Sequence, residues 1–286
     1  METTNLTISA NNILISYDDI GVGALPNIPI IFVHGFPFDK SMWKEQMEFF
    51  KSTNRVIAYD LRGFGRSSAN TSPMTIDLFV ADLLAFMDAL KIPKAILCGF
   101  SMGGYIALHA MKKNQDRFEA LILCDTQCIA DSPEAKEGRY KAIEKIKAEG
   151  ITQFGNDFIK KVFHEDSLTG KKELVDGLKN VVIANTNESI IGGLTALAER
   201  SDSCYVLNKI KIPTLIICGR EDQVTPLRES EFMHENIADS TLHAIHHAGH
   251  VSNLEQPMMF NKHLADFLSV VKSLAASDGA SRNIAL

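Results

Sequence analysis

The sequence predicts an α/β fold in which helices cover both faces of a mostly parallel central sheet and a helical segment is inserted. Short apolar runs without alternation recur along the chain, which is typical of strands buried on both faces of such a sheet. Patterns with helical spacing lie between most of these runs. Residues 131–207 show helical patterns and no convincing strand, and this stretch is too long for a structureless loop in a compact domain.

The predicted strands begin with a hairpin. Leu6 and Ile8 alternate with polar residues, as do Ile13 and Ile15, and an Asn-rich turn joins the two segments. The continuous apolar runs that follow predict buried strands over residues 29–33, 55–59, 95–98, 120–124 and 214–218. Residues 242–245 are also strand-like.

The predicted helices lie between these strands. Ser41 and Thr75 are residues of the preferred N-cap type, and each precedes a helical pattern. Pro226 suits the first turn of a later helix. Two further helices are predicted over residues 102–111 and about 256–274.

This pattern divides the chain into four parts. Residues 1–130 and 208–275 form the predicted α/β core. Residues 131–207, which we call the cap segment, form a predicted helical cap between the two core parts. The small polar residues over 276–286 predict a mobile C-terminal tail.

Composition excludes several classes of protein. The chain has 286 residues, of which 45% are apolar and 22% charged, so collagen-like and disordered classes are excluded. The net charge of −6 and the lack of a dense Lys/Arg block argue against a nucleic-acid partner. No apolar run reaches the roughly 18 residues of a membrane helix, and the N-terminus lacks the features of a signal peptide. We therefore expect a cytoplasmic protein with no nucleic-acid partner and no membrane partner.

The cysteines support the same expectation. Their number is odd, they are widely spread and no CxxC pair is present: Cys98, Cys124, Cys128, Cys204 and Cys218. We expect small buried residues in a reducing compartment, and neither a metal site nor a disulfide.

The most informative motif is Gly99-Phe100-Ser101-Met102-Gly103, where a predicted strand meets a predicted helix. A Gly-x-Ser-x-Gly motif in this context indicates a nucleophile elbow. The tight turn brings neighbouring backbone close to the serine, so the two flanking positions must lack side chains. The motif predicts Ser101 as a nucleophile, next to the N–H groups and positive dipole end of the following helix.

A serine hydroxyl needs a base. His250 follows the last predicted strand and precedes the last helix, so it is the predicted base. His243, His246 and His247 are rivals, but strand residues alternate between faces and cannot all point at one site. We expect these three to be solvated or hydrogen-bonded structural histidines.

The base needs an orienting carboxylate. Asp222 lies in the loop after a predicted strand, and the order Ser101, Asp222, His250 is that of an enzyme with a nucleophile elbow. Glu221 is adjacent and is expected to face elsewhere. Asp125, which ends the strand after the elbow helix, is the alternative acid.

Two N–H groups are expected to bind the negative charge of a tetrahedral intermediate. One belongs to Met102, and the other to Phe36 in the loop after an early strand, where Gly35 lets the backbone turn. Each such donor typically lowers the barrier by about 2.7–4 kcal/mol. His34 is expected to brace this loop through hydrogen bonds. Phe36, Phe100 and Met102 flank the predicted site, so we expect them to bind an apolar part of the substrate.

Five motifs in this order resemble the α/β-hydrolase superfamily over nearly the whole chain. They occupy residues 34–37, 60–67, 99–104, 219–226 and 249–250. The chain is similar to the enol-lactonase-like and haloperoxidase-like bacterial esterases with a helical cap, and residues 198–203 resemble that group's return from cap to core. The resemblance implies Ser101, Asp222 and His250 as the triad and Phe36 and Met102 as oxyanion donors. It also implies that residues 60–67 form a structural turn.

Serine at the elbow favours acyl transfer, whereas relatives with aspartate there attack sp³ carbon. We expect a hydrolase of carboxylic esters that needs no metal or organic cofactor. An enol-lactonase or C–C bond hydrolase with the same triad is the first alternative, and a slow, receptor-like binder is the second. A dicarboxylate lactone calls for a cation near the site. Arg200 or Arg139 could supply it, although a solvated place in the cap is expected for both. The oligomeric state is not predicted.

Overall fold

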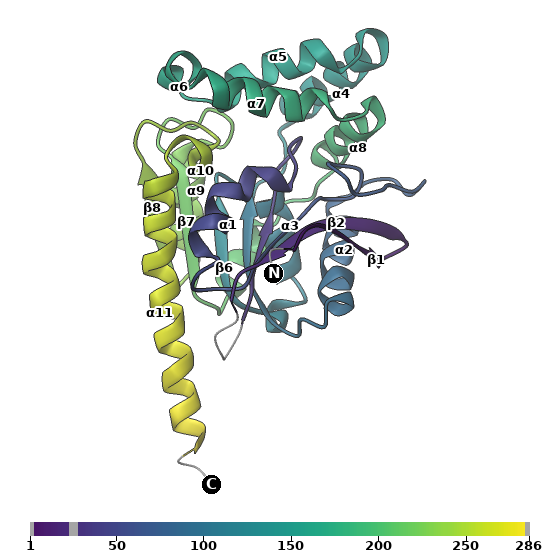
Figure 1. The fold of residues 1–286 in the computed structure, drawn as a ribbon. Helices are drawn as coiled ribbons and strands as arrows, with labels where there is room; N and C mark the ends of the chain where they lie inside the picture. The colour runs from purple at the N-terminus through teal and green to yellow at the C-terminus, as the bar shows by residue number, and fades with distance from the viewer. Residues whose placement is uncertain (1–2, 23–27, 284–286) are drawn as a thin grey trace.

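A computed structural model of the chain describes residues 3–22 and 28–283, and it has the predicted sheet between helical layers (Figure 1). The described strands form one eight-stranded sheet in the order β1-β2-β4-β3-β5-β6-β7-β8. β1 (Thr3–Ala10) and β2 (Ile13–Ile20) are the predicted antiparallel hairpin, and β2 also pairs antiparallel with β4 (Val56–Tyr59). All later pairs are parallel.

The inner strands are buried almost along their whole length, which explains why their sequences do not alternate. Besides β4, they are β3 (Ile30–Val33), β5 (Ala95–Phe100), β6 (Phe118–Cys124) and β7 (Thr214–Gly219). β8 (Ser240–Ile245) lies at the edge of the sheet and is only partly buried.

Helices cover both faces of the sheet. One face packs against α2 (Ile76–Ala89), α3 (Met102–Met111) and α9 (Leu227–Asn236). The other packs against α1 (Lys44–Phe50) and α11 (Pro257–Asn283). The connections contain the short helices η1 (Lys40–Trp43), η2 (Gln115–Arg117), η3 (Cys204–Lys209) and α10 (Ser252–Glu255).

Of the predicted helix starts at Ser41, Thr75 and Pro226, the structure confirms one and differs at the other two. Thr75 caps α2 as predicted, because its side chain accepts a hydrogen bond from Leu78 N at 3.0 Å. The prediction of Ser41 as a cap was wrong. The Asp39 carboxylate accepts from Ser41 N at 2.9 Å and starts η1, which precedes α1. Pro226 occupies the N-cap position of α9 and not its first turn.

The last helix is longer than predicted. α11 continues past the expected end at about Leu274 to Asn283, and its far end projects beyond the sheet (Figure 1). The stretch predicted as a tail is therefore helical up to residue 283, which is compatible with the high helix propensity of its alanines. Residues 284–286 lie outside the described residues, and the mobility of the tail stays a prediction.

The cap segment is helical, as its patterns indicate. Between β6 and β7 the chain forms α4 (Pro133–Glu149), α5 (Ile151–Val162), α6 (Glu165–Gly170), α7 (Lys172–Ile183) and α8 (Asn187–Ala198). These helices lie together above the sheet (Figure 1). No helix in the described ranges is both long and apolar enough to span a lipid bilayer.

A disulfide joins Cys128 to Cys204, so the prediction of unpaired cysteines was wrong for these two. Their Cα atoms lie 4.8 Å apart, within the range that the bond requires. Ser203 N donates to Cys128 O at 2.9 Å, so the chain entering the cap segment runs beside the chain leaving it. A separation of 76 residues hides this proximity from the sequence. Cys98, Cys124 and Cys218 are free and buried, as predicted.

We expect this disulfide to stabilise the fold. In the double variant Cys128→Ser/Cys204→Ser, the free energy of unfolding should fall by up to about 4 kcal/mol, because a cross-link over so long a loop restricts the unfolded chain. Urea unfolding midpoints measure the change. A reducing agent should lower the midpoint of the oxidised wild type and leave that of the variant unchanged. Equal midpoints for the oxidised wild type and the variant would contradict this expectation.

Candidate active site

Ser101 stands at a sharp turn between β5 and α3. Its φ of 50° is a conformation that non-glycine residues seldom adopt and that is found at strained functional turns. A Cβ atom on Gly99 would lie 2.3 Å from Gly103 O, and one on Gly103 would lie 2.3 Å from Val33 O. Both flanking residues must therefore be glycine, as the elbow motif requires.

The three predicted triad side chains meet. Ser101 Oγ and His250 Nε2 lie 2.9 Å apart, and His250 Nδ1 lies 2.8 Å from Asp222 Oδ2. All three residues are buried, with Ser101 8% exposed and His250 1% exposed. In this arrangement the carboxylate can hold Nδ1 protonated, which leaves Nε2 free to accept the hydroxyl proton.

The loop before α9 fixes the Asp222 carboxylate. Oδ1 accepts hydrogen bonds from Val224 N at 2.7 Å and from Thr225 N at 3.0 Å. Thr225 Oγ1 donates to Oδ2 at 2.7 Å and lies 3.3 Å from His250 Nδ1. Burial alone would raise the pKa of Asp222, but the charge of His250 and the hydrogen bonds from His250 and Thr225 lower it. Sequence reasoning missed Thr225, because only its spacing from Asp222 hinted at such a turn.

The two rival acids have other partners. Asp125 Oδ1 accepts from Gly219 N at 2.7 Å, and Oδ2 accepts from Ser252 Oγ at 2.6 Å. Burial and the neighbouring Asp222 raise the pKa of Asp125 well above its ordinary value. Glu221 accepts from Ala248 N at 3.2 Å. Asp125 thus ties strand ends together, and Glu221 faces elsewhere, as expected.

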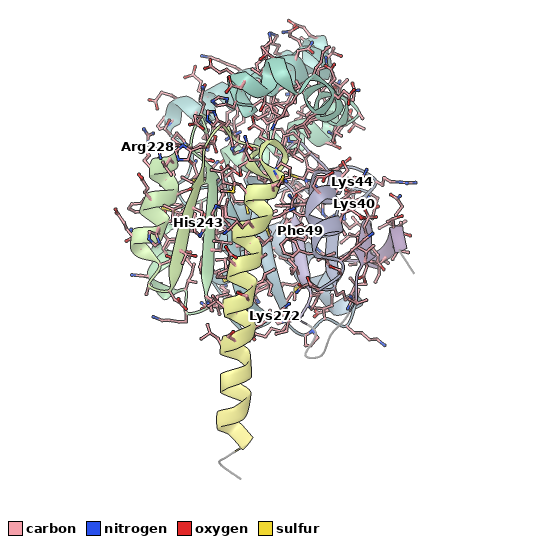
Figure 2. All side chains as sticks on the ribbon, turned by 60° about the vertical axis from the view of Figure 1, so that its left-hand side comes forward. Lys40, Lys44, Phe49, Arg228, His243 and Lys272 are labelled. Atoms are coloured by element: carbon pink, nitrogen blue, oxygen red, sulfur yellow. A yellow bond between two sulfur atoms is a disulfide. The ribbon has the colours of Figure 1, made fainter. Side chains whose placement is uncertain are left out.

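The rival histidines lie elsewhere too. His243, on β8 beside α11 (Figure 2), stacks on His263 with ring centroids 3.9 Å apart. His246 is exposed, and the side chain of His247 is 73% exposed. The Ser101 hydroxyl is therefore paired with His250.

The loop after β3 runs beside Ser101. A Cβ on Gly35 would lie 2.9 Å from Ser101 Cβ, so glycine permits this approach. Across residues 3–22 and 28–283, no protein acceptor takes a hydrogen bond from the N–H of Phe36 or Met102. His34 braces the loop as predicted: Nε2 accepts from Leu61 N at 2.9 Å and Nδ1 lies 2.9 Å from Gly35 O. Burial lowers the pKa of His34, which favours this neutral role.

Residues 60–67 form the structural turn that the resemblance implied. The Asp60 carboxylate accepts from Lys40 N at 2.8 Å and from Arg66 N at 2.9 Å, and it forms an ion pair with Lys40 Nζ at 3.0 Å (Lys40 is labelled in Figure 2). Arg62 Nη2 lies 2.5 Å from Asp82 Oδ1, and both side chains are buried. The charged side chains of Asp60 and Arg62 are therefore paired with other residues of the fold.

Aromatic rings from the core and the cap segment gather around Phe36 in the loop after β3. The ring centroid of Phe36 lies 6.0 Å from that of Phe64 and 6.2 Å from those of Phe154 and Phe158 on α5. These edge contacts form an apolar cluster of rings that includes the loop beside Ser101. The cap segment therefore contributes side chains to the surroundings of the candidate site.

Phe100 and Met102 are buried more deeply than Phe36. The ring centroid of Phe100 lies 5.1 Å from that of His250, and its side chain is fully buried. Met102 is fully buried in the core cluster on the side of α2 and α3. Contact of either side chain with a substrate stays a prediction.

Arg200 is buried, so the expectation of a solvated cap arginine was wrong for this residue. Its side chain is 2% exposed, and Nη1 donates to Asp131 Oδ1 at 2.6 Å. Its guanidinium lies 4.4 Å from the ring centroid of Tyr105, which is one helical turn along the chain from Ser101. Arg139 bonds the same carboxylate. Two guanidinium groups therefore share one carboxylate, and Arg200 Nε has no hydrogen-bond partner among the described residues.

Comparison with known proteins agrees with this geometry. A family model for the α/β hydrolase fold matches residues 28–257. The chain is 32% identical to 3-oxoadipate enol-lactonase 2 of Acinetobacter baylyi over 259 residues, which cover 89% of this chain and 93% of that enzyme. It is 30% identical to a putative non-heme chloroperoxidase of Synechocystis over 89% of this chain and 94% of that protein. The structure of a thermophilic esterase from Thermogutta terrifontis superposes with a TM-score of 0.88 at 33% identity, covering 94% of this chain and 99% of that one. With an elbow, a buried Ser–His–Asp arrangement and these relatives, the chain belongs to the α/β-hydrolase fold family.

Proposed function

We propose that this chain is a serine hydrolase that cleaves carboxylic esters of small, partly apolar substrates through an acyl-enzyme on Ser101. One observation carries the proposal: the buried hydrogen-bond chain that runs from Ser101 Oγ through His250 to Asp222 Oδ2. Similarity to an esterase and to an enol-lactonase supports the same class of reaction.

In the proposed mechanism, His250 Nε2 accepts the Ser101 proton while Oγ attacks the ester carbonyl carbon. The N–H groups of Phe36 and Met102 bind the oxyanion that forms. As the intermediate collapses, the C–O bond breaks and the imidazolium protonates the departing alkoxide. A water then attacks the acyl-enzyme, giving its proton to the same imidazole, and the acid leaves as Ser101 regains its proton. Asp222 holds the imidazole in the required tautomer and stabilises the imidazolium.

We also propose that residues 131–207 act as a cap that selects the substrate. Phe154 and Phe158 from α5 pack against Phe36 in the loop after β3, which favours a substrate with an apolar acyl or alcohol group. A cytoplasmic location remains part of this proposal. It requires the pair Cys128 and Cys204 to be reduced in the cell, because disulfides are rare in that compartment.

A substrate panel with an active-site label tests the proposed activity. Short p-nitrophenyl esters and lactones are assayed with the wild type, and a fluorophosphonate is used to label the protein. We expect turnover of neutral esters and a single adduct that peptide mass spectrometry assigns to Ser101. Labelling without turnover of any ester or lactone would favour a receptor-like protein. Absence of both would overturn the proposal.

A second candidate is hydrolysis of an enol-lactone that carries a carboxylate. The observation that favours it is the positive charge left where Arg139 and Arg200 share Asp131, with Arg200 Nε unpartnered. A carboxylate bound there would gain a charge-assisted hydrogen bond. The similarity to an enol-lactonase supports the same substrate class.

Arg200→Gln separates the two substrate classes. If Arg200 binds a substrate carboxylate, kcat/KM for an anionic enol-lactone should fall by roughly 10- to 100-fold, since hydrogen bonds to charged groups contribute about 1.5–3 kcal/mol. kcat/KM for a neutral ester should change much less. Arg139→Gln, which alters the other guanidinium on Asp131, is the matched control. Equal losses for both substrates in Arg200→Gln would assign this arginine a structural role only.

A further inference from the structure

Three side chains outside the triad gather where the cap segment meets the core. His164 follows α5, Asp166 lies in the first turn of α6, and His247 follows β8. One ring nitrogen of each histidine and one carboxylate oxygen all lie within 4.8 Å of one another. We propose that His164, Asp166 and His247 form a binding site for a transition-metal ion of the Zn²⁺ class that links the cap segment to the core.

The spacing of these atoms fits coordination better than hydrogen bonding. His164 Nδ1 and His247 Nδ1 each lie 3.5 Å from Asp166 Oδ2, which is long for a hydrogen bond. Two ligand atoms bound to zinc at about 2.0–2.1 Å with a tetrahedral angle are about 3.4 Å apart. His164 Nδ1 also accepts from Asp166 N at 3.2 Å, a weak hydrogen bond that metal binding would replace. The side chains of Asp166 and His247 are 69% and 73% exposed, so they can rotate to close the ligand set.

Hydrogen bonds hold the connection between α5 and α6 against the loop after β8, and they do so without a metal. His250 N donates to Val162 O at 2.7 Å. The buried Glu255 accepts from His164 N at 2.8 Å and, through its other oxygen, from Gly249 N at 2.7 Å. A Cβ on Gly249 would lie 2.8 Å from His164 N, so only glycine permits this approach. The backbone around both histidines is thus already fixed, which reduces the conformational entropy that is lost when a metal binds.

The ligand types indicate which ion fits. Two imidazoles and one carboxylate suit Zn²⁺, Cu²⁺ or Ni²⁺, whereas Mg²⁺ and Ca²⁺ prefer oxygen ligands throughout. Three protein ligands leave at least one coordination position for water. Bound there, the ion ties the α5–α6 connection to the loop that carries His250. It takes no part in the ester chemistry proposed above, so the site stands whether or not that activity is found.

Calorimetry on chelator-treated, full-length protein tests the site, with Zn²⁺ as the probe. The wild type should bind one Zn²⁺ per chain. His247→Ala and Asp166→Asn should each weaken binding by roughly tenfold or more, as losing even a group that only supports a ligand costs 10- to 100-fold. The neighbouring exposed residues supply matched controls: His246→Ala and Glu165→Gln should bind like the wild type.

Three results would overturn the proposal. One is the absence of saturable binding by the wild type. Another is an equal loss in His246→Ala and His247→Ala, which would indicate general histidine binding. The third is binding that survives in His247→Ala and is lost in His243→Ala, which would assign the ion to the His243–His263 pair beside α11 (Figure 2). Because His247 and Asp166 are exposed, their substitution should leave the urea unfolding midpoint of the metal-free protein unchanged, and this is checked alongside.

Discussion

Ser101→Ala should lower kcat for a short p-nitrophenyl ester by about 10⁶-fold, because no other group can form the acyl-enzyme once the hydroxyl is gone. The side-chain hydroxyl contacts His250 Nε2, so its loss should leave the turn at residue 101 and the proposed oxyanion donors in place. A small rate above that in water should remain from those donors. Initial rates over a range of ester concentrations measure the effect.

The control for this prediction is a buried serine outside the hydrogen-bond chain of Ser101, His250 and Asp222. Ser230 lies on α9, and Ser230→Ala should keep kcat close to that of the wild type. Both variants should keep the wild-type circular dichroism spectrum. Turnover by Ser101→Ala within about tenfold of the wild type would remove Ser101 from the role of nucleophile.

The sheet and the meeting of Ser101, Asp222 and His250 were predictable, because their signals are local or carried by chain order. Continuous apolar runs indicate buried strands, and the elbow occupies five consecutive residues. His250 was separated from His243 by its place after the strand, and its imidazole pairs with Ser101 as expected. Each of these inferences needed only one segment and its neighbours.

The errors arose where two distant segments meet or where neighbouring residues compete. Cys128 and Cys204 are brought together by the two ends of the cap segment, which no local pattern reveals. Arg200 is buried because Asp131 and the ring of Tyr105 lie around it, and its own sequence neighbourhood is polar. At the first helix, Asp39 and Ser41 are both residues that commonly cap helices. The backbone turns at Asp39, so Asp39 is the N-cap.

The second large effect is expected for Asp222→Asn, which should lower kcat by about 10⁴-fold through the wrong imidazole tautomer. Val224 N and Thr225 N both donate to Oδ1, so the amide oxygen of asparagine must stay on that side. The amide NH₂ then takes the place of Oδ2, 2.8 Å from His250 Nδ1. As a donor it requires Nδ1 to accept, which places the proton on Nε2. An imidazole with Nε2 protonated cannot take the proton of Ser101.

Asp125→Asn is the matched control, because Asp125 was the rival acid and is equally buried. Burial and Asp222 raise its pKa, so the neutral carboxyl persists to higher pH than usual, and an amide imitates it. The amide oxygen can accept from Gly219 N, and its NH₂ can donate to Ser252 Oγ, so both contacts survive. We therefore expect Asp125→Asn to keep kcat within about tenfold of the wild type. If it loses as much activity as Asp222→Asn, the hydrogen-bond chain through Asp222 does not by itself explain catalysis, and the coupling of the two carboxyl groups must be part of it.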